Sequence, residues 1–496
     1  MPETLAAERE MSPETAAASG NSPFLSSIWF VVLAAFLLRV FLCLLSHRLD
    51  SVHPVRAFVG GEADYVAWSL HSGKGFSSPF PGYARPTAWL APVFPALWSF
   101  GFALFNPFRT QGHVYFCQFL NSAFAALTCV PIYKMGIRLL GERPAIVSGW
   151  CWALLPLAIL FPLEWAWDQS LAALLFAWLL STTYLLSEDR ARNWIWAGYG
   201  LLWGVAALTN PSLGVMLPFW LGWMAVVRWR RGLPVVAPAL TAVLICLLTL
   251  APWTVRNYRL FGHFVFVKSN FGAELWLGNN PQVKDGFTGW LHPMVNAAEL
   301  QQLNELGEYA YMQRKQREGV DFIRGNPELF AKHAALRVLD TWAGTYYFKE
   351  DPWIRSLGLG SIAVACTLVF SLAAGVGLLR AARRNWMEFL PLILCVIVFP
   401  IPYYITHSSL RYRHPMDPVL TLLAVAGYWG WRTSPRKHTT MVRSMSHPAE
   451  DGRHSAVLNF LTDCGDALRE RPERPYGEVL RRSICGTTRP TPRCLR

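Results

Sequence analysis

The chain has 496 residues, of which 53% are hydrophobic and 14% aromatic, and it carries a formal net charge of +13. A soluble domain of ordinary composition cannot bury so much apolar surface, so the composition predicts a protein whose solvent is the lipid bilayer. The distribution of the positive charge argues against nucleic acid as a partner, because Lys and Arg concentrate in short connections and in the tail after residue 432.

The apolar residues gather in runs that are each long enough for a spanning helix of about 20 residues. In chain order, these runs are 26–46, 113–134, 145–163, 169–187, 194–209, 211–229, 236–253, 356–380, 386–406 and 414–432. The polar segment 1–25 has neither the basic start nor the small-residue cleavage site of a signal peptide, so the first run is predicted to remain as a helix. The predicted fold class is an all-α polytopic membrane protein with about ten transmembrane helices.

Basic residues at the ends of the runs predict how the chain crosses the membrane. The clusters, which fall at alternate connections, are Lys134/Arg138/Arg143, Arg190/Arg192, Arg228/Arg230/Arg231, Arg380/Arg383/Arg384 and Arg432/Arg436/Lys437. By the positive-inside rule, these connections and both termini are cytoplasmic. The connections 164–168, 209–211, 254–352 and 407–413 then face the periplasm of a cell inner membrane.

One further apolar stretch, 88–106, is long enough to span but would spoil this alternation. Pro92 and Pro95 lie inside it, which favours a broken element at the outer membrane surface. The first outer loop is therefore predicted to run over 47–112. Long ordered loops are often functional.

The chain divides into five predicted regions. These are a disordered cytoplasmic N-terminus (1–25), a transmembrane core (26–253), a periplasmic loop region (254–352), C-terminal transmembrane helices (353–432) and a basic, disordered cytoplasmic tail (433–496). In the periplasmic region, Asn296 and Glu299 form a capping-box pattern, which predicts one helix of about 28 residues that ends near Gly325. The sequence has no convincing pair of inverted halves of the kind that transporters show.

Acidic residues mark two outer positions. Glu62 and Asp64 lie in the first outer loop, and Glu164 and Asp168 lie between two predicted spans. A carboxylate inside hydrocarbon costs about 2.5–3.5 kcal/mol on insertion scales, so acids at helix ends usually face protein or water. Either these four are candidate site residues or they are ordinary solvated loop acids. Their spacing alone does not decide between the two.

Arginines at headgroup depth form a complementary set. The outward-facing members are Arg85, Arg256, Arg259, Arg411 and Arg413. Guanidinium groups bind phosphate bidentately and stay charged, which predicts contact with a lipid phosphate at the outer surface. Ordinary snorkelling toward headgroups explains any single one of them equally well.

Several segments resemble one known family. They are Glu62–Tyr65, Leu70–Phe76, Arg85–Pro92, Trp167–Leu171, Ala251–Tyr258, Asn270–Asn280 and Arg411–Arg413. In order and in placement they resemble the GT-C membrane glycosyltransferases, in particular the protein O-mannosyltransferases and the bacterial lipid A aminoarabinose transferases. Many members of that family have an adjacent Asp-Glu pair in the first outer loop, whereas Ala63 separates Glu62 from Asp64 here.

The resemblance implies a GT-C-like bundle with interfacial helices in the first outer loop and a small outer-face region. It also implies an enzyme that moves a sugar from a polyprenyl-phosphate carrier to an acceptor hydroxyl on a lipid, glycan or protein, with inversion. Glu62 or Asp64 would accept the proton of the acceptor and Asp168 would orient hydroxyls, while Glu164 would contact substrate. The arginines expected to bind the departing phosphate are Arg85, Arg256, Arg411 and Arg413. Some distant GT-C enzymes use a divalent metal, but no cluster in this sequence indicates a metal site or another cofactor.

Two other functions remain open at the level of sequence. A transporter or flippase has the same polytopic topology, but it should carry ionisable residues near the bilayer midplane, where this chain has little except Arg39. A polymerase or ligase of lipid-linked glycans would depend on the large outer region 254–352 rather than on Glu62 and Asp64.

Overall fold

A computed structural model of the chain describes residues 27–49, 61–105, 112–164, 167–188, 192–284, 286–350 and 358–429. The predictions for the N-terminus 1–25 and the tail 433–496 therefore lie outside the described residues, as do residues 50–60 and 106–111 of the loop 47–112. Within the described residues the regular structure is helical, with two isolated bridges and no strand. The all-α prediction is confirmed.

The helices fall into a bundle and an outer group. The helices of the bundle and of the first loop are α1 (Ile28–Leu49), α2 (Glu62–His71), α3 (Val93–Leu104), α4 (Gly112–Leu127), α5 (Cys129–Leu139), α6 (Glu142–Leu154), α7 (Pro156–Glu164), α8 (Gln169–Glu188), α9 (Asn193–Thr209), η2 (Pro211–Met216), α10 (Leu217–Arg230) and α11 (Val236–Phe261). Those that follow are α12 (Phe271–Gly278), η3 (Gly289–Leu291), α13 (Ala297–Leu306), α14 (Glu308–Gly325), α15 (Pro327–Ala343), α16 (Tyr347–Glu350), α18 (Gly360–Val398), α19 (Ile401–Ile405), α20 (Leu410–Arg413), η4 (His414–Met416) and α21 (Asp417–Trp429).

Within the described residues, fewer helices are long and apolar enough to span a membrane than the ten that the sequence predicts. Six helices of the described chain are long and apolar enough to cross a membrane, or seven if the pair α6–α7, bent by 43°, counts as one span. Two more of the predicted runs form helices that are shorter, α9 with 17 residues and α21 with 13. A multi-pass membrane protein is confirmed, but the count of ten spans is not.

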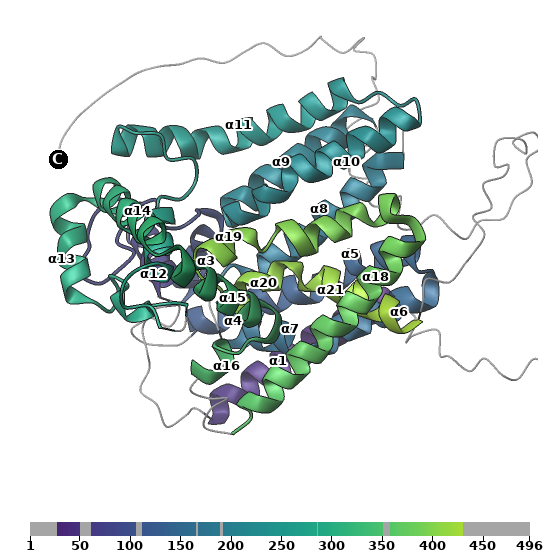
Figure 1. Cartoon of the computed structure of the whole chain (residues 1–496), viewed down its shortest axis with the longest axis horizontal. Helices are drawn as coiled ribbons and strands as arrows, with labels where there is room; N and C mark the ends of the chain where they lie inside the picture. Colours follow the sequence, from purple (N-terminus) through teal and green to yellow (C-terminus); the bar gives the residue numbers. More distant parts are fainter. Residues whose placement is uncertain are drawn as a thin grey trace, which may run out of the picture. The chain divides into compact units, whose positions relative to one another are not determined.

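Two predicted spans, 356–380 and 386–406, meet in α18. This helix covers 39 residues, but the backbone of Asn385 is not helical, with φ −157° and ψ 77°. Figure 1 shows the ribbon of α18 turning back on the right of the bundle. The element is therefore a hairpin of two helical legs rather than one long helix. Asn385 provides part of the reason, because its side-chain oxygen accepts a hydrogen bond from the backbone N–H of Glu388 at 3.4 Å, at the start of the second leg.

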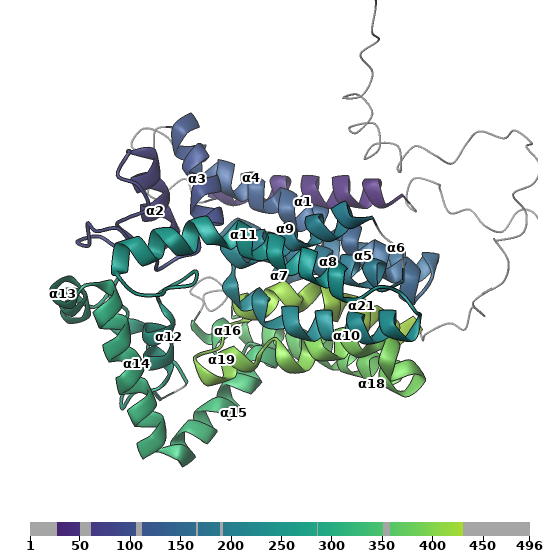
Figure 2. The same cartoon turned by 90° about the horizontal axis from the view of Figure 1, so that it is seen from above.

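Small residues allow the bundle helices to pack closely. A Cβ atom at Gly377 of α18 would clash with the carbonyl oxygen of Leu423 in α21, and one at Gly200 of α9 would clash with that of Ala242 in α11. Lipid tails are as apolar as Leu, so helices in a bilayer associate through such close contact rather than through exclusion of water. Figures 1 and 2 show α9 beside α11 and α18 beside α21.

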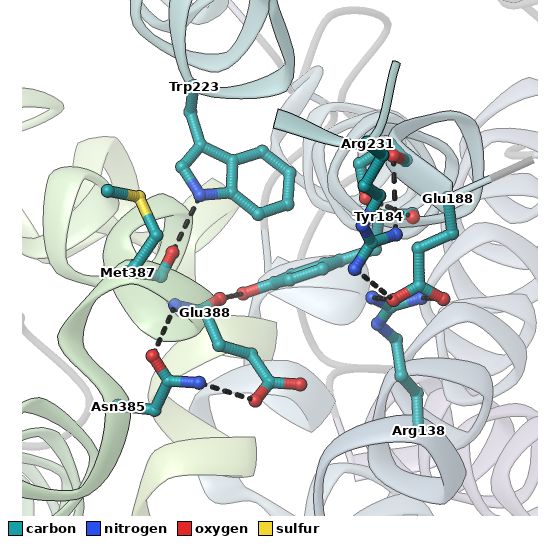
Figure 3. Close-up of polar contacts among 9 residues, drawn as sticks. Arg138, Tyr184, Glu188, Trp223, Arg231, Asn385, Met387 and Glu388 are labelled. Atoms are coloured by element: carbon teal, nitrogen blue, oxygen red, sulfur yellow. Dashed lines mark hydrogen bonds and ion pairs between the residues drawn. The ribbon is translucent and has the colours of Figure 1, made fainter. Parts of the chain in front are cut away.

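Three of the five predicted basic clusters lie in connections that the structure describes at one end of this bundle, whereas Arg190 and the cluster Arg432/Arg436/Lys437 lie outside the described residues. The α5–α6 and α10–α11 connections and the turn in α18 are on the right in Figure 1, while α12–α15 lie at the opposite end. Figure 3 shows how side chains join the helices near the basic end. Arg138 pairs with Glu188 at 2.6 Å, Arg231 pairs with the same carboxylate at 3.3 Å, and the Tyr184 hydroxyl donates to the carbonyl oxygen of Glu388 at 3.0 Å. These contacts tie α5, α8, the end of α10 and α18 together, and the common cytoplasmic side of the clusters stays a prediction.

Arg39, the cation predicted near the bilayer midplane, lies in α1 and is fully buried. It donates to the carbonyl oxygens of Ala153 and Ala158 at 3.1 and 3.0 Å. Both carbonyls lack a helical partner for a local reason. The helix breaks between α6 and α7 just after Ala153, and the residue four positions beyond Ala158 is Pro162, which has no N–H. Arg39 therefore completes the hydrogen bonding of a broken helix.

Replacing Arg39 by Met should lower the thermal stability of the protein. An unpaired buried polar group costs about 1–3 kcal/mol, and this change leaves two carbonyls without their donor. The melting temperature of the protein in nanodiscs, followed by Trp fluorescence, measures the loss. Leu37→Met, on the exposed face of the same helix, is the control and should melt like the wild type. Equal melting of the Arg39 variant would show that other groups satisfy these carbonyls.

The outer group differs from the prediction at one point. The single helix predicted after Asn296 is divided into α13 and α14 by Gly307, whose φ of 78° belongs to the left-handed region that favours glycine. The predicted cap is confirmed, since the Asn296 side chain accepts a hydrogen bond from the N–H of Glu299 at 3.1 Å. The apolar stretch 88–106 contains α3, whose 12 residues extend about 18 Å and so cannot cross a hydrocarbon core of about 30 Å.

Candidate active site

A cavity of about 700 Å³ opens between the first loop, the bundle and the outer group. Its volume lies within the range of about 300–1,000 Å³ that small-molecule sites occupy. Its walls come from α2, α3, η2 and α12, from the α7–α8 connection, and from the segments 287–295 and 402–412. Aromatic side chains form much of the lining: Trp89, Phe94, Trp167, Phe266, Phe271 and Phe287.

Charged and titratable side chains from distant parts of the chain meet in this cavity. Apart from tyrosines they are Glu62, Asp168, Lys268, Glu274, His292, His407 and Arg411. The cavity thus brings together three residues that the sequence predicts as site residues, namely Glu62, Asp168 and Arg411. The other four were missed. Glu274 lies in a segment that carries the family resemblance, which was a usable signal, but no spacing pointed to Lys268 or His292.

The two candidate bases of the first loop have different environments. Both lie in the first turn of α2, where a carboxylate is favoured by the helix dipole. Glu62 lines the cavity, and its carboxylate lies 3.3 Å from Nε2 of His292. Asp64 is fully buried and does not line the cavity. Of the two, only Glu62 is placed to touch a molecule bound there.

Asp168 lies directly before α8 and also lines the cavity. Its backbone carbonyl accepts the N–H of Ala172 at 2.8 Å, in the manner of a residue that begins a helix. Burial raises the pKa of Asp168, while Lys268, a side-chain hydrogen bond from Asn210 and Arg411 lower it in part. The side chain therefore sits between cations and an amide donor, an arrangement suited to hold hydroxyl groups. The side chain of Glu164, the other acid of this predicted pair, lies outside the described part of the structure.

Arg411 is held in the cavity wall by two contacts. Its guanidinium lies over the ring of Trp167, 4.1 Å from the centroid, and donates to the hydroxyl of Tyr412 at 2.9 Å. Burial by itself would lower the pKa of Arg411, but Tyr412 and the carboxylates of Glu62 and Glu274 raise it above its ordinary value. The charge is therefore retained at all physiological pH values.

His407 and Glu274 continue this polar wall. Nε2 of His407 lies 2.9 Å from the hydroxyl of Tyr412 and 3.5 Å from Oε2 of Glu274, and its ring stacks on Phe287 at 4.3 Å. Burial lowers the pKa of His407 to about 4, although Glu274 acts in the opposite direction. The imidazole is therefore neutral at pH 7 and acts as a hydrogen-bonding group rather than as a third cation.

Three arginines that the sequence predicts as phosphate ligands, Arg413, Arg256 and Arg85, lie outside the cavity. Arg413 is buried and pairs with Asp417 at 2.9 Å, between α20 and α21. Arg256 donates to the carbonyl oxygens of Thr87 and Phe76 at 2.6 and 2.9 Å and so holds the first loop against α11. Arg85 is exposed on that loop. None of the three lines the cavity, so their predicted role in binding substrate is not supported by their position.

The segment Asn270–Asn280 builds one wall of the cavity. Arg337 of α15 donates to the carbonyl oxygens of Gly278, Tyr404 and Ile405, and Asn279 donates to that of Ile405 at 2.9 Å. These bonds join the end of α12 to the stretch that precedes α20. Part of the motif that carries the family resemblance therefore positions Glu274 and His407 rather than touching the cavity itself.

The described residues include no group of three or more His, Cys, Asp or Glu side chains that could hold a metal ion. Three of the charged side chains have a close partner, since Glu62 contacts His292, Glu274 contacts His407, and Arg411 lies over the ring of Trp167. The cavity holds three carboxylates, those of Glu62, Asp168 and Glu274, and two cations, Lys268 and Arg411.

Comparison with known proteins supports the resemblance that the sequence predicts. Residues 86–255 match the family model described as dolichyl-phosphate-mannose-protein mannosyltransferase, which confirms the resemblance to the GT-C membrane glycosyltransferases over less than half of the chain. No curated protein is significantly similar to the chain.

Solved structures of low sequence identity are also similar. The oligosaccharyltransferase of Archaeoglobus fulgidus in the apo form is 14% identical, with a TM-score of 0.47, and the match covers 79% of this chain and 50% of that one. ArnT from Cupriavidus metallidurans bound to undecaprenyl phosphate is 15% identical, with a TM-score of 0.36, over 80% of this chain and 76% of that one. The chain thus matches about half the length of the archaeal enzyme.

Proposed function

We propose that the protein is a membrane glycosyltransferase that moves a sugar from a polyprenyl-phosphate carrier to the hydroxyl group of an acceptor, with inversion at the anomeric carbon. The observation that carries this proposal is the composition of the cavity, in which the carboxylates of Glu62 and Asp168 share one space with Lys268 and Arg411. The matched family model, whose description names a dolichyl-phosphate sugar as donor, supports the same class of reaction.

Glu62 acts as the general base in this proposal. The acceptor oxygen attacks the anomeric carbon and passes its proton to the Glu62 carboxylate, while the bond from that carbon to the phosphate oxygen breaks and polyprenyl phosphate leaves. The anomeric carbon is oxocarbenium-like in such a transition state. A base of this kind needs to be within hydrogen-bond reach of the hydroxyl more than it needs an unusual pKa. Glu62 meets that condition because it lines the cavity, whereas Asp64 does not.

Arg411 and Lys268 bind the phosphate of the donor. Negative charge grows on that phosphate as the sugar leaves, so fixed cations stabilise the transition state more than the ground state. Both cations lie in the same cavity as Glu62, and Lys268 and Arg411 both act on the pKa of Asp168, which places them close to that carboxylate. Asp168 then accepts hydrogen bonds from hydroxyl groups of the sugar or of the acceptor.

The aromatic lining suits the apolar parts of the substrates. Trp89, Phe94, Phe266 and Phe271 line the cavity, and Phe266 and Phe271 are also exposed at the protein surface. Sites for small molecules typically combine such apolar walls with a few polar groups that fix orientation. The polyprenyl chain lies in the bilayer, which removes the need for a long internal channel.

The orientation in the cell follows from the basic clusters. With these clusters cytoplasmic, α12–α15 and the cavity face the periplasm of a cell inner membrane, and both termini are cytoplasmic. The acceptor is a lipid, glycan or protein that reaches this face.

The proposal is tested by the lipid that the protein carries and by what it does to that lipid. Mass spectrometry of lipids extracted from the purified protein should find a polyprenyl phosphate or its sugar ester. Incubation with a polyprenyl-phosphate sugar and a membrane extract as acceptor should release free polyprenyl phosphate. Movement of an intact sugar lipid across a vesicle without cleavage would instead support a flippase. Growth of a lipid-linked glycan would support a polymerase or ligase.

A further inference from the structure

We propose that His292, a residue of the outer region far from Glu62 in the chain, is a positioning residue that holds the Glu62 carboxylate in place for proton transfer. This inference rests on the proposed function, because it assigns a role within the same reaction. Nε2 of His292 lies 3.3 Å from Oε1 of Glu62, and both side chains line the cavity. The side chains are 18% and 10% exposed, so water competes little with this contact.

The hydrogen bonding of the ring identifies the nitrogen that carries the proton. The backbone N–H of Met294 donates to Nδ1 of His292 at 3.2 Å. A nitrogen that accepts a hydrogen bond is unprotonated, so in the neutral imidazole the proton is on Nε2. The proton on Nε2 is therefore available to the carboxylate of Glu62, whose Oε1 lies 3.3 Å away. A neutral donor orients the carboxylate without placing a full positive charge beside the base.

The ring itself is held from several sides. Phe80 and Trp89 both meet it edge to face, each with ring centroids 5.5 Å from that of His292. The backbone around it is a tight turn, in which the carbonyl oxygen of His292 accepts the N–H groups of Val295 and Asn296, both at 2.9 Å. Because the His292 ring is held in one orientation, it can orient the Glu62 carboxylate. A donor on a freely rotating side chain could not do so.

The side chain of Glu62, the other member of this pair, must also be held in one conformation. Glu62 is the first residue of α2, and Gly61 before it has a φ of 65°, so the chain enters the helix through a sharp turn. A glutamate at the start of a helix has three rotatable side-chain bonds and several accessible rotamers. In this proposal the 3.3 Å contact from His292 to Oε1 selects one of these rotamers and leaves Oε2 to accept the proton of the acceptor hydroxyl. A displacement of about 1 Å in such a base can cost about 100-fold in rate.

Two substitutions of His292 separate this role from a packing role. Gln keeps an N–H donor at about the reach of Nε2 but loses the aromatic ring, while Phe keeps the ring between Phe80 and Trp89 but has no donor. We expect His292→Phe to lower kcat by about 10- to 100-fold with the donor KM unchanged within about twofold, and His292→Gln to recover most of the loss. His263→Phe, which changes an exposed histidine that stacks on Tyr309 outside the cavity, should leave turnover unchanged.

Any other pattern of activities in these two variants contradicts the inference. If His292→Phe is active and His292→Gln is not, the aromatic ring contributes by packing and its N–H group does not contribute. If both variants turn over like the wild type, the contact between residue 292 and Glu62 has no role in catalysis. If both lose kcat equally at an unchanged melting temperature, the N–H group at position 292 is not the feature that supports turnover. Glu62→Gln is measured in the same series. Should Glu62→Gln stay active, the proposed base is wrong, whereas an inactive Glu62→Gln beside a fully active His292→Phe refutes only the role of His292.

Discussion

Glu62→Gln is expected to lower kcat for sugar transfer by about 100- to 10,000-fold, the range that a positioned general base contributes. Gln has nearly the same size and can still accept the hydrogen bond from His292, but it cannot take a proton. The donor should still bind, because the cations proposed to hold its phosphate are unchanged. Release of polyprenyl phosphate measures kcat, and the amount of co-purified donor lipid reports binding.

Controls for this experiment come from the same part of the chain. Glu305→Gln changes an exposed acid of α13 outside the cavity and should be without effect.

Asp64→Asn is the critical comparison, since the sequence does not distinguish Asp64 from Glu62. Because Asp64 is fully buried, we expect its variant to lose thermal stability more than turnover per folded molecule. Wild-type turnover of Glu62→Gln with loss in Asp64→Asn would assign the base to Asp64, and wild-type turnover of the double variant would exclude this loop as the catalytic centre. Asp168→Asn should reduce turnover less than Glu62→Gln.

Arg411→Gln is expected to raise the KM for the donor and to lower kcat, with a combined loss of about 10- to 100-fold or more in kcat/KM. A hydrogen bond to a charged group contributes about 1.5–3 kcal/mol, and the phosphate charge that Arg411 meets grows as the sugar leaves. Arg411→Lys should recover only part, because an ammonium group cannot bind phosphate bidentately or stack on Trp167 in the same way. Steady-state kinetics with a short-chain polyprenyl-phosphate sugar measure both constants.

Other arginines distinguish this site from general attraction of a lipid headgroup. Arg317→Gln removes an exposed cation of α14 outside the cavity and should have no effect. Arg85→Gln decides between the expectation from sequence, in which Arg85 binds the phosphate, and the structure, in which Arg85 lies outside the cavity. Unchanged kinetics for Arg411→Gln would place the donor phosphate elsewhere. Equal losses for Arg85, Arg317 and Arg411 would indicate only a nonspecific effect of charge.

Local sequence pattern was sufficient to predict most helices of this protein. Each predicted apolar run falls on a helix, on a pair of helices or on one leg of α18, because in a bilayer the backbone must satisfy its own hydrogen bonds and a run of about 20 apolar residues has few other conformations. The Asn296 cap was predictable for the same reason, since it depends only on residues three positions apart. The resemblance to GT-C enzymes was also visible in short segments, without knowledge of their contacts.

The roles of individual charged residues were decided by tertiary structure. Arg411 and Arg413 are two positions apart, yet one lines the cavity and the other pairs with Asp417 inside the bundle. Glu62 and Asp64 show the same divergence, because on a helix two residues that are two apart face different neighbours. Sequence spacing identifies the face of a helix but not what packs against that face. Lys268 and His292 could not be found from the sequence for this reason: their meaning depends on partners that lie far away in the chain and come close only when the outer region folds over the first loop.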